Sequence, residues 1–191
     1  MKRTFLLLFV ALTLSLSPCL LPAARAQNGS SDDYTIRLRG ADGKTYDVSN
    51  MRGHVVLVSF GATWCQPCKE ELRALEELKD AYRDKPVKFF WVSVEPEEQV
   101  SDKQLVSFAR SVKFTFPILR DADRWAYAQF STRQRIPLVV FFDKQGRFAA
   151  PAHVGMSTPE KYKQMVRGAL DRLLADQSKA SASGSNGRSS N

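Results

Sequence analysis

Trp64-Cys65-Gln66-Pro67-Cys68 is the stretch that decides the fold, and it stands between an apolar run and a charged stretch with helical spacing. Two cysteines with two residues between them can close a small disulfide ring and exchange two electrons with another thiol pair. A helix N-terminus favours a thiolate, because its unpaired backbone N–H groups and its dipole attract negative charge. The stretch therefore predicts a redox-active pair at a strand-to-helix junction.

The residues on either side define that junction. The run from Val55 to Phe60 is almost entirely apolar, which is typical of a strand buried on both faces. The stretch from Pro67 to Tyr82 carries apolar residues at helical spacing. Proline suits the first turn of a helix, where backbone N–H groups have no partner within the helix. A helix that begins here places Cys68 one turn inside it.

The positions of the two cysteines predict different roles. Cys65, at the junction, is expected to be exposed and to act as the attacking nucleophile. Cys68, three residues later, is expected to be more buried and to act as the resolving thiol. The alternatives are a structural disulfide or a pair of core thiols. A ring this small adds little stability, because the gain from a disulfide grows with loop length.

The remaining sequence periodicity predicts a mixed α/β fold. Asp42-Gly43 indicates a hairpin turn, and Ser101 with Gln104 forms a capping box at a helix start. The expected strands are 34–39, 44–48, 87–94, 137–142 and a hairpin partner from residue 147, and the further helices are 101–112, 123–130 and 158–175. This order predicts a β-hairpin followed by a central mixed sheet with helices on both faces.

The two ends of the 191-residue chain are expected to lie outside this domain. Positive residues, an apolar stretch and Ala24-Arg25-Ala26 predict a secretory signal peptide at 1–26. A linker at 27–33, a domain at 34–175 and a disordered tail at 176–191 would follow. Two alternatives remain for the N-terminus. One is a retained membrane anchor, for which the apolar run is short, and the other is lipid attachment at Cys19.

The composition limits the possible functions. Cleavage after Ala26 would leave Cys65 and Cys68, too few cysteines for a disulfide scaffold or a four-ligand zinc site. His54 and His153 are interpreted as polar residues at strand ends, so no metal site is expected. Cleavage would lower the net charge from +8 to +5. Because no dense basic run with interleaved aromatic residues is present, no nucleic-acid partner is expected.

The chain resembles the thioredoxin-fold superfamily, and more narrowly its extracytoplasmic branch of TlpA and ResA-type proteins. Three segments carry the resemblance: residues 60–71 with the two cysteines, residues 116–121, and residues 136–143 with the glycine at 146. The match extends over about residues 34–175. The resemblance implies a thioredoxin-like fold and a thiol–disulfide oxidoreductase that needs no cofactor besides its own Cys65–Cys68 disulfide.

The resemblance also implies roles for neighbouring residues. A cis peptide bond is expected at Ile136–Pro137, placed against the cysteine pair, where it would help to bind the client backbone. Trp64, which would cover one side of the pair, is expected to contribute to the same binding. Gln66 and Pro67 occupy the positions that tune the redox potential in this family.

Two acidic residues are candidates for proton handling. Cytoplasmic thioredoxins carry a buried Asp where this chain has Ser59, whereas ResA-like proteins carry a Glu at the position of Glu71. Glu71 shares a helix face with Cys68, so its charge would raise the pKa of nearby thiols, and burial would raise its own pKa. The alternative is an ordinary solvent-facing helix residue. Glu95, at the end of the second buried strand, is the weaker candidate.

These features predict an extracytoplasmic, most simply periplasmic, reductant of particular client disulfides. In this family such clients serve cytochrome c maturation or metal-site assembly, and a membrane thiol carrier supplies the electrons. The alternatives are a disulfide oxidant or isomerase, and an adaptor that binds Cu(I) through the same cysteines. A peroxidase is less favoured, because Thr63 lies only two residues before Cys65 and does not form a Thr-x-x-Cys arrangement.

Overall fold

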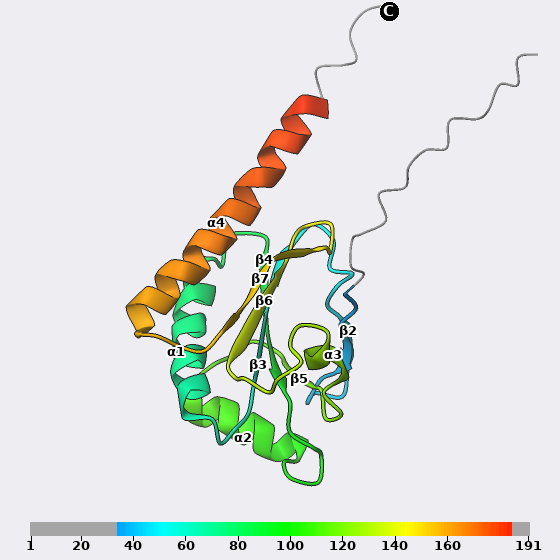
Figure 1. Cartoon of the computed structure of the whole chain (residues 1–191), viewed down its shortest axis with the longest axis vertical. Coiled ribbons are helices and arrows are strands. Elements are labelled where there is room, and N and C mark those ends of the chain that lie inside the picture. The colour runs from blue at the N-terminus through cyan, green and yellow to red at the C-terminus, as the bar shows by residue number, and fades with distance from the viewer. Residues whose placement is uncertain (1–33, 185–191) are drawn as a thin grey trace, which may run out of the picture. The chain divides into compact units, whose positions relative to one another are not determined.

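The centre of the molecule is the strand β3 (Val55–Gly61), all of whose residues are buried. It pairs in parallel with β4 (Val87–Ser93) and antiparallel with β6 (Leu138–Phe142). β5 (Ile118–Arg120) and β7 (Phe148–Val154) complete a five-stranded mixed sheet in the order β5-β4-β3-β6-β7. Figure 1 shows this computed structural model, which describes residues 34–184. The expected signal peptide, the linker at 27–33 and residues 185–191 lie outside the described residues.

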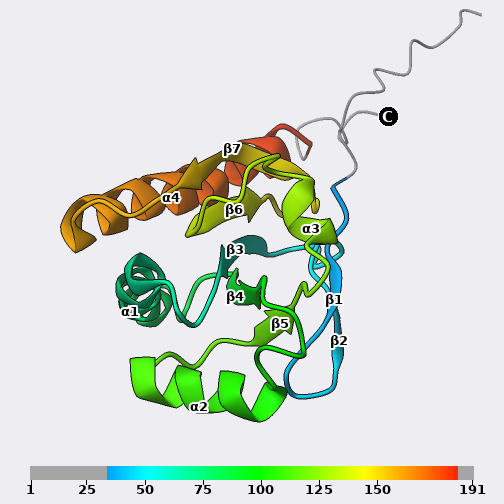
Figure 2. The same ribbon diagram turned by 60° about the horizontal axis from the view of Figure 1, so that its bottom comes forward.

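The two faces of the sheet bury different elements. Val55 and Leu57 of β3 pack with residues of α1 (Gln66–Ala81), α2 (Asp102–Val112) and α4 (Pro159–Gly184). The alternate residues of β3 pack with α3 (Trp125–Ala128) and with residues that flank the hairpin of β1 (Arg37–Arg39) and β2 (Thr45–Asp47). Figure 2 shows the three long helices on one side of the sheet and α3 with the hairpin on the other. The predicted mixed α/β fold with an N-terminal hairpin is confirmed.

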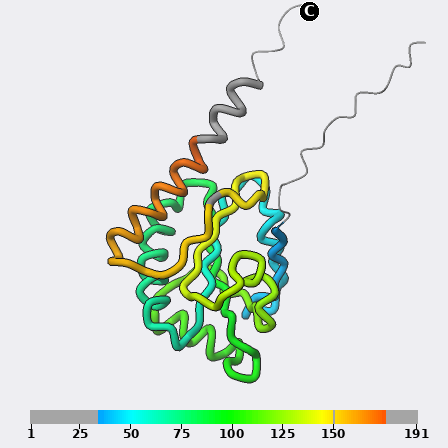
Figure 3. Tube along the Cα trace, in the orientation of Figure 1, coloured from blue at the N-terminus to red at the C-terminus, as the bar shows by residue number. Residues whose placement is uncertain are grey.

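The helix starts follow the predicted chemistry. α2 begins after Ser101, whose side chain accepts the N–H of Gln104 while the Gln104 side chain accepts the N–H of Ser101, so the predicted capping box is present. α1 begins directly after β3, with proline in its first turn. The Cα trace in Figure 3 follows β3 into α1. The Cys65–Cys68 pair therefore lies where the central strand becomes a helix.

The hairpin lies beside the β5 edge of the sheet. Gly40, between β1 and β2, forms an isolated bridge with Leu119, and the Ala41 N–H donates to the Ile118 carbonyl oxygen at 2.9 Å. β5 itself was not expected from the sequence. It has three residues, which is too short a segment for a periodic pattern to emerge, and it is defined by its pairing with β4.

The last helix is longer than predicted. α4 starts at Pro159, as expected, but it continues to Gly184 and does not end near Ala175. Residues 176–184 therefore continue the helix instead of beginning the tail. They contain alanine, lysine and glutamine and neither proline nor glycine before Gly184, so nothing in this segment stops a helix that is already formed. Within residues 34–184, no helix is long and apolar enough to cross a membrane.

Candidate active site

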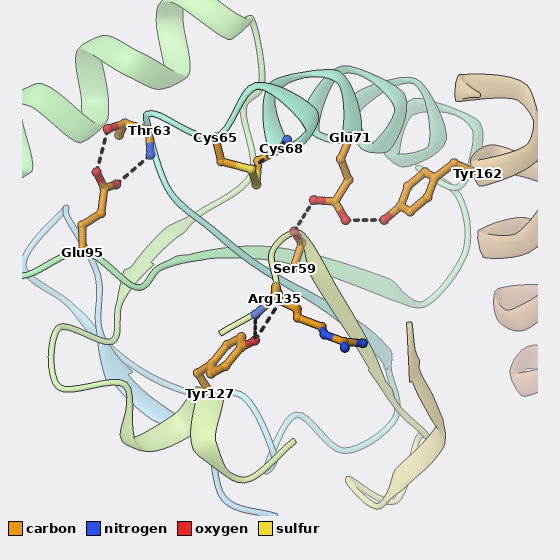
Figure 4. Close-up of a disulfide and its surroundings, with 9 residues drawn as sticks. All are labelled: Ser59, Thr63, Cys65, Cys68, Glu71, Glu95, Tyr127, Arg135 and Tyr162. Atoms are coloured by element: carbon orange, nitrogen blue, oxygen red, sulfur yellow. Dashed lines mark hydrogen bonds between the residues drawn. A yellow bond between two sulfur atoms is a disulfide. The ribbon is translucent and has the colours of Figure 1, made fainter. Parts of the chain in front are cut away.

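The two cysteines form a disulfide at the N-terminus of α1. The Sγ–Sγ distance is 2.11 Å, and Cys65 is the N-cap residue of the helix. Cys65 Sγ also accepts the backbone N–H of Cys68 at 3.2 Å, as a polar cap side chain does at a helix start. Figure 4 shows the pair with the residues around it. The helix start thus directs a backbone N–H group at the sulfur predicted to be the nucleophile.

The burial of the pair partly corrects the prediction. Cys65 was expected to be exposed, but it is 5% exposed, while Cys68 is fully buried. The predicted order of exposure holds, yet both sulfur atoms lie close to the interior. The physical reason is that Ala62 and Ile136 pack against the disulfide. A thiol that attacks this disulfide from solvent can approach only the Cys65 sulfur.

The loop before β6 supplies one wall of the site. The Ile136–Pro137 peptide bond is cis, as the resemblance implied, and Ile136 packs against the cysteine pair. The Tyr127 hydroxyl of α3 accepts the Arg135 N–H at 2.7 Å (Figure 4). The same hydroxyl lies 2.9 Å from the Arg133 carbonyl oxygen, to which it can donate. The hydroxyl of a buried tyrosine therefore holds the backbone of this loop in place.

The other residues predicted beside the pair lie on the surface. Trp64 is 64% exposed. Gln66 and Pro67 are also exposed, with the proline in the first turn of α1. An exposed indole next to a barely accessible sulfur forms an apolar surface that a client chain can contact.

Glu71 is completely buried, which excludes the interpretation as a solvent-facing helix residue. Ser59 Oγ donates to one carboxylate oxygen at 2.7 Å, and the Tyr162 hydroxyl donates to the other at 2.5 Å (Figure 4). Burial raises the pKa of Glu71 from 4.5 to about 7, and the hydrogen bonds from Tyr162 and Ser59 oppose that rise. A carboxyl group with this pKa exchanges its proton near neutral pH.

Tyr162 is a site residue that the sequence did not indicate. It lies in the first turns of α4, fully enclosed, and burial together with the Glu71 carboxylate raises its pKa well above the usual value. Its partner is 91 positions away in the chain. Helical periodicity marks such a tyrosine as a core residue, and no spacing rule connects it with α1.

Glu95 holds the loop that precedes the cysteines. Its carboxylate accepts the Thr63 N–H at 2.7 Å and the Thr63 hydroxyl at 2.8 Å, and Ser93 Oγ donates to it at 3.2 Å. Glu95 is 5% exposed, so these bonds replace most of its contact with water. The carboxylate fixes the backbone two residues before Cys65, as Figure 4 shows.

The described part of the chain contains no cluster of metal-ligating side chains. Within residues 34–184 there is no group of three or more His, Cys, Asp or Glu side chains placed to hold a metal ion. The chemistry available at the site is that of two cysteines, a buried carboxyl group with a pKa near neutrality, and the backbone N–H groups of a helix start.

The fold and the site together define a thioredoxin-like thiol–disulfide oxidoreductase. Residues 32–150 match the AhpC/TSA family, and the chain belongs to that family. It is 32% identical over 129 residues to the thioredoxin-like protein YneN of Bacillus subtilis, which covers 68% of this chain and 73% of YneN. It is 28% identical over 142 residues to the thiol-disulfide oxidoreductase ResA of Geobacillus thermodenitrificans, covering 74% and 76% of the two chains.

Solved structures show the same fold. A putative thiol:disulfide interchange protein DsbE from Chlorobium tepidum superposes with a TM-score of 0.63 at 20% identity, over 73% of this chain and 93% of that one. StoA from Bacillus subtilis superposes with a TM-score of 0.54 at 23% identity, over 68% and 94% of the two chains. The sequence relatives YneN and ResA confirm the resemblance to ResA-type proteins, and the solved structures confirm the fold.

Proposed function

We propose that this oxidoreductase works mainly as a reductant of client disulfides outside the cytoplasm. The observation that carries the proposal is the buried carboxyl group of Glu71, one helical turn from Cys68 and held by Ser59 and Tyr162. When it is ionised, its negative charge disfavours a second negative charge on a neighbouring sulfur. Strong disulfide oxidants owe their potential to a stabilised reduced form. A site that opposes thiolate formation supports the opposite direction of electron flow.

The proposed reaction moves two electrons to the client. The thiolate of Cys65 attacks one sulfur of the client disulfide, forming a Cys65–client bond, while the second client sulfur leaves as a thiolate and takes up a proton. Cys68 then transfers its proton to the Glu71 carboxylate. Its thiolate attacks Cys65 Sγ, which forms the Cys65–Cys68 disulfide and releases the first client sulfur. The client is reduced, and the pair is oxidised.

Ile136, Pro137 and Trp64 are the proposed contact surface for the client. Ile136 packs on the pair and Trp64 is exposed beside it, so an extended segment laid between them would bring its disulfide to Cys65. Clients with haem-attachment or metal-site cysteines fit this role. A membrane thiol carrier would return the site to the dithiol form by the same exchange in reverse.

A cysteine trap tests the function. In full-length chains expressed in the native compartment, Cys68→Ser should accumulate mixed disulfides through Cys65, because the resolving sulfur is missing. The matched control, Cys65→Ser, should accumulate few or none. Adducts that dissolve on adding a dithiol identify the clients. The proposal fails if Cys68→Ser traps no protein and the unaltered chain does not reduce insulin.

The redox potential separates the reductant from the oxidant or isomerase. A potential near about −120 mV would identify a strong oxidant. A value close to that of thioredoxin, about −270 mV, supports the reductant. Tight Cu(I) binding without any thiol–disulfide exchange would instead select the adaptor role. N-terminal sequencing of the mature protein tests the proposed cleavage after Ala26 and, with it, the periplasmic location.

A further inference from the structure

One buried donor near the disulfide has no acceptor. Trp91 of β4 is fully buried, and its indole Nε1 has no hydrogen-bond partner among the described residues. A buried N–H group without an acceptor is costly, because it has given up its bond to water. Such groups in a native structure call for an explanation, for example a redox or catalytic role.

The indole ring is held in a fixed position. Its centroid lies 5.3 Å from that of Phe108 and 5.7 Å from that of Phe114. In the register of the sheet, Trp91 lies beside Ser59, whose hydroxyl bonds Glu71. Because the ring is packed on aromatic neighbours and 0% exposed, its N–H cannot turn to solvent for a partner.

Gly61 shows what the N–H group approaches. A Cβ placed on this glycine, the last residue of β3, would lie 2.7 Å from Trp91 Nε1 and 3.2 Å from Cys68 Sγ. The indole nitrogen and the Cys68 sulfur therefore border the same small space, which exists because the residue between them has no side chain. The third heavy atom nearest to such a Cβ is the Cβ of Cys68, which is apolar.

The acceptor strength of the sulfur changes with the redox state. In the disulfide, Cys68 Sγ is bonded to Cys65, is a weak acceptor and forms no hydrogen bond with Trp91 Nε1, so the bond requires the sulfur or the indole ring to move when the Cys65–Cys68 bond opens. After reduction it becomes a thiol or a thiolate, and a thiolate accepts a charge-assisted hydrogen bond. We propose that Trp91 donates its indole N–H to the Cys68 thiolate in the reduced form and in the mixed disulfide, and that Gly61 keeps the space between them open.

This bond would act against the Glu71 charge. Titratable groups near the pair come from α1 (Glu71), from α4 (Tyr162) and from the segment that follows β4 (Glu95). While Glu71 is ionised it disfavours the thiolate of Cys68, whereas the indole N–H favours that thiolate both before and after Glu71 takes up the Cys68 proton. When the pair reduces a client, the bond favours the attacking Cys68 thiolate, and in the opposite direction it favours Cys68 as the leaving group, so the inference does not depend on the proposed reductant role.

The test uses the full chain with Cys19→Ser and Cys65→Ser, which leaves Cys68 as the single thiol. Glu71→Gln is added so that the carboxyl titration does not overlap. Thiolate ultraviolet absorbance against pH gives the pKa of Cys68. Trp91→Phe should raise it, so that about tenfold less thiolate is present at a pH below the pKa. Gly61→Ala should act in the same direction, while Trp125→Phe, an exposed tryptophan on α3, should leave the titration unchanged.

A second measurement needs no change at Trp91. The chain has three tryptophans, so nitrogen-15 spectra of the same Cys68-only chain contain three indole N–H resonances, assigned with the Phe variants. The Trp91 resonance should shift with the pKa measured for Cys68, while the Trp125 resonance should not. The inference is overturned if the Trp91 resonance does not follow the Cys68 titration, even if Trp91→Phe itself fails to fold.

Discussion

Ser59 and Glu71, 12 positions apart in the chain, meet in the interior, where the serine hydroxyl donates to the glutamate carboxylate at 2.7 Å. Cytoplasmic thioredoxins, as the resemblance implied, place a buried aspartate at the strand position that Ser59 occupies. In this chain the strand supplies only a hydroxyl, and α1 supplies the carboxyl group from the other side. A buried acid is therefore present beneath the cysteine pair, although the strand residue alone would suggest that it is missing.

Glu71→Gln should flatten the dependence of stability on pH. The folded-state pKa of Glu71 is about 7 and its ordinary value is 4.5, so the folded chain binds more protons than the unfolded chain between these values. The free energy of unfolding of the oxidised protein should therefore fall by about 3 kcal/mol as the pH rises through this window. Urea unfolding at about pH 5 and about pH 8 measures the difference. Equal pH dependence in the two proteins would contradict the assignment.

Tyr162→Phe should raise the pKa of Glu71 further. The tyrosine hydroxyl stabilises the ionised carboxylate, and its loss should move the pKa upward by about one unit. Infrared titration of the buried carboxyl band, identified by its disappearance in Glu71→Gln, measures the shift.

Tyr82→Phe is the matched control for that experiment. The Tyr82 hydroxyl at the end of α1 donates to Asp171 of α4 at 2.6 Å, so this variant also removes a tyrosine–carboxylate bond between the same two helices. It should lower the free energy of unfolding without changing the titration of Glu71. If both variants shift the Glu71 titration equally, the direct bond from Tyr162 is not the cause.

Thr63→Val should loosen the loop before the cysteines. It removes the Thr63 hydroxyl that donates to Oε1 of the buried Glu95 carboxylate, at a cost of about 1–3 kcal/mol in the free energy of unfolding. Thr115 bonds Glu76 in the same way, through its N–H at 2.9 Å and its hydroxyl at 2.7 Å, but at an exposed site. Thr115→Val should therefore cost less. Urea unfolding and hydrogen exchange at the Thr63 N–H provide the comparison, and equal losses would argue against a special role for Glu95.

Ile136→Ala should have opposite effects on small and large thiols. Ile136 packs against the disulfide, so a smaller side chain should expose Cys65 and speed its reduction by a small dithiol. The same change should slow exchange with a protein client several-fold, because part of the proposed contact surface is lost. Stopped-flow rates with dithiothreitol and with the trapped client measure both. A parallel loss in the two rates would point to a damaged fold.

The sequence predicted those features that depend on neighbouring residues. Three of them can be read from a few consecutive residues, and the structure contains all three: the apolar run of β3, the proline in the first turn of α1 and the Ser101 capping box. Glu71 was identified from the resemblance and from its spacing to Cys68. Its complete burial and its two hydroxyl donors could be seen only in the structure.

The features that were missed depend on distant contacts. β5 is a strand because it pairs with β4, and Tyr162 joins the site because α4 packs on α1. Cys65 is less exposed than predicted because Ile136, far along the chain, covers it. The indole N–H of Trp91 has no acceptor, a fact that no single segment of sequence contains.

Two tyrosine–carboxylate hydrogen bonds join α1 to α4. Both tyrosine–carboxylate bonds, Glu71 with Tyr162 and Asp171 with Tyr82, join the helix that carries the sulfur atoms to the last helix of the domain. A protein cut before Pro159 would keep both cysteines and the whole sheet. The carboxyl group of Glu71 would then face water on the side that α4 covers in the full domain. Under the role proposed for Glu71, substitutions in the C-terminal helix would thus adjust the acidity of the thiols while every residue of the cysteine loop stays the same.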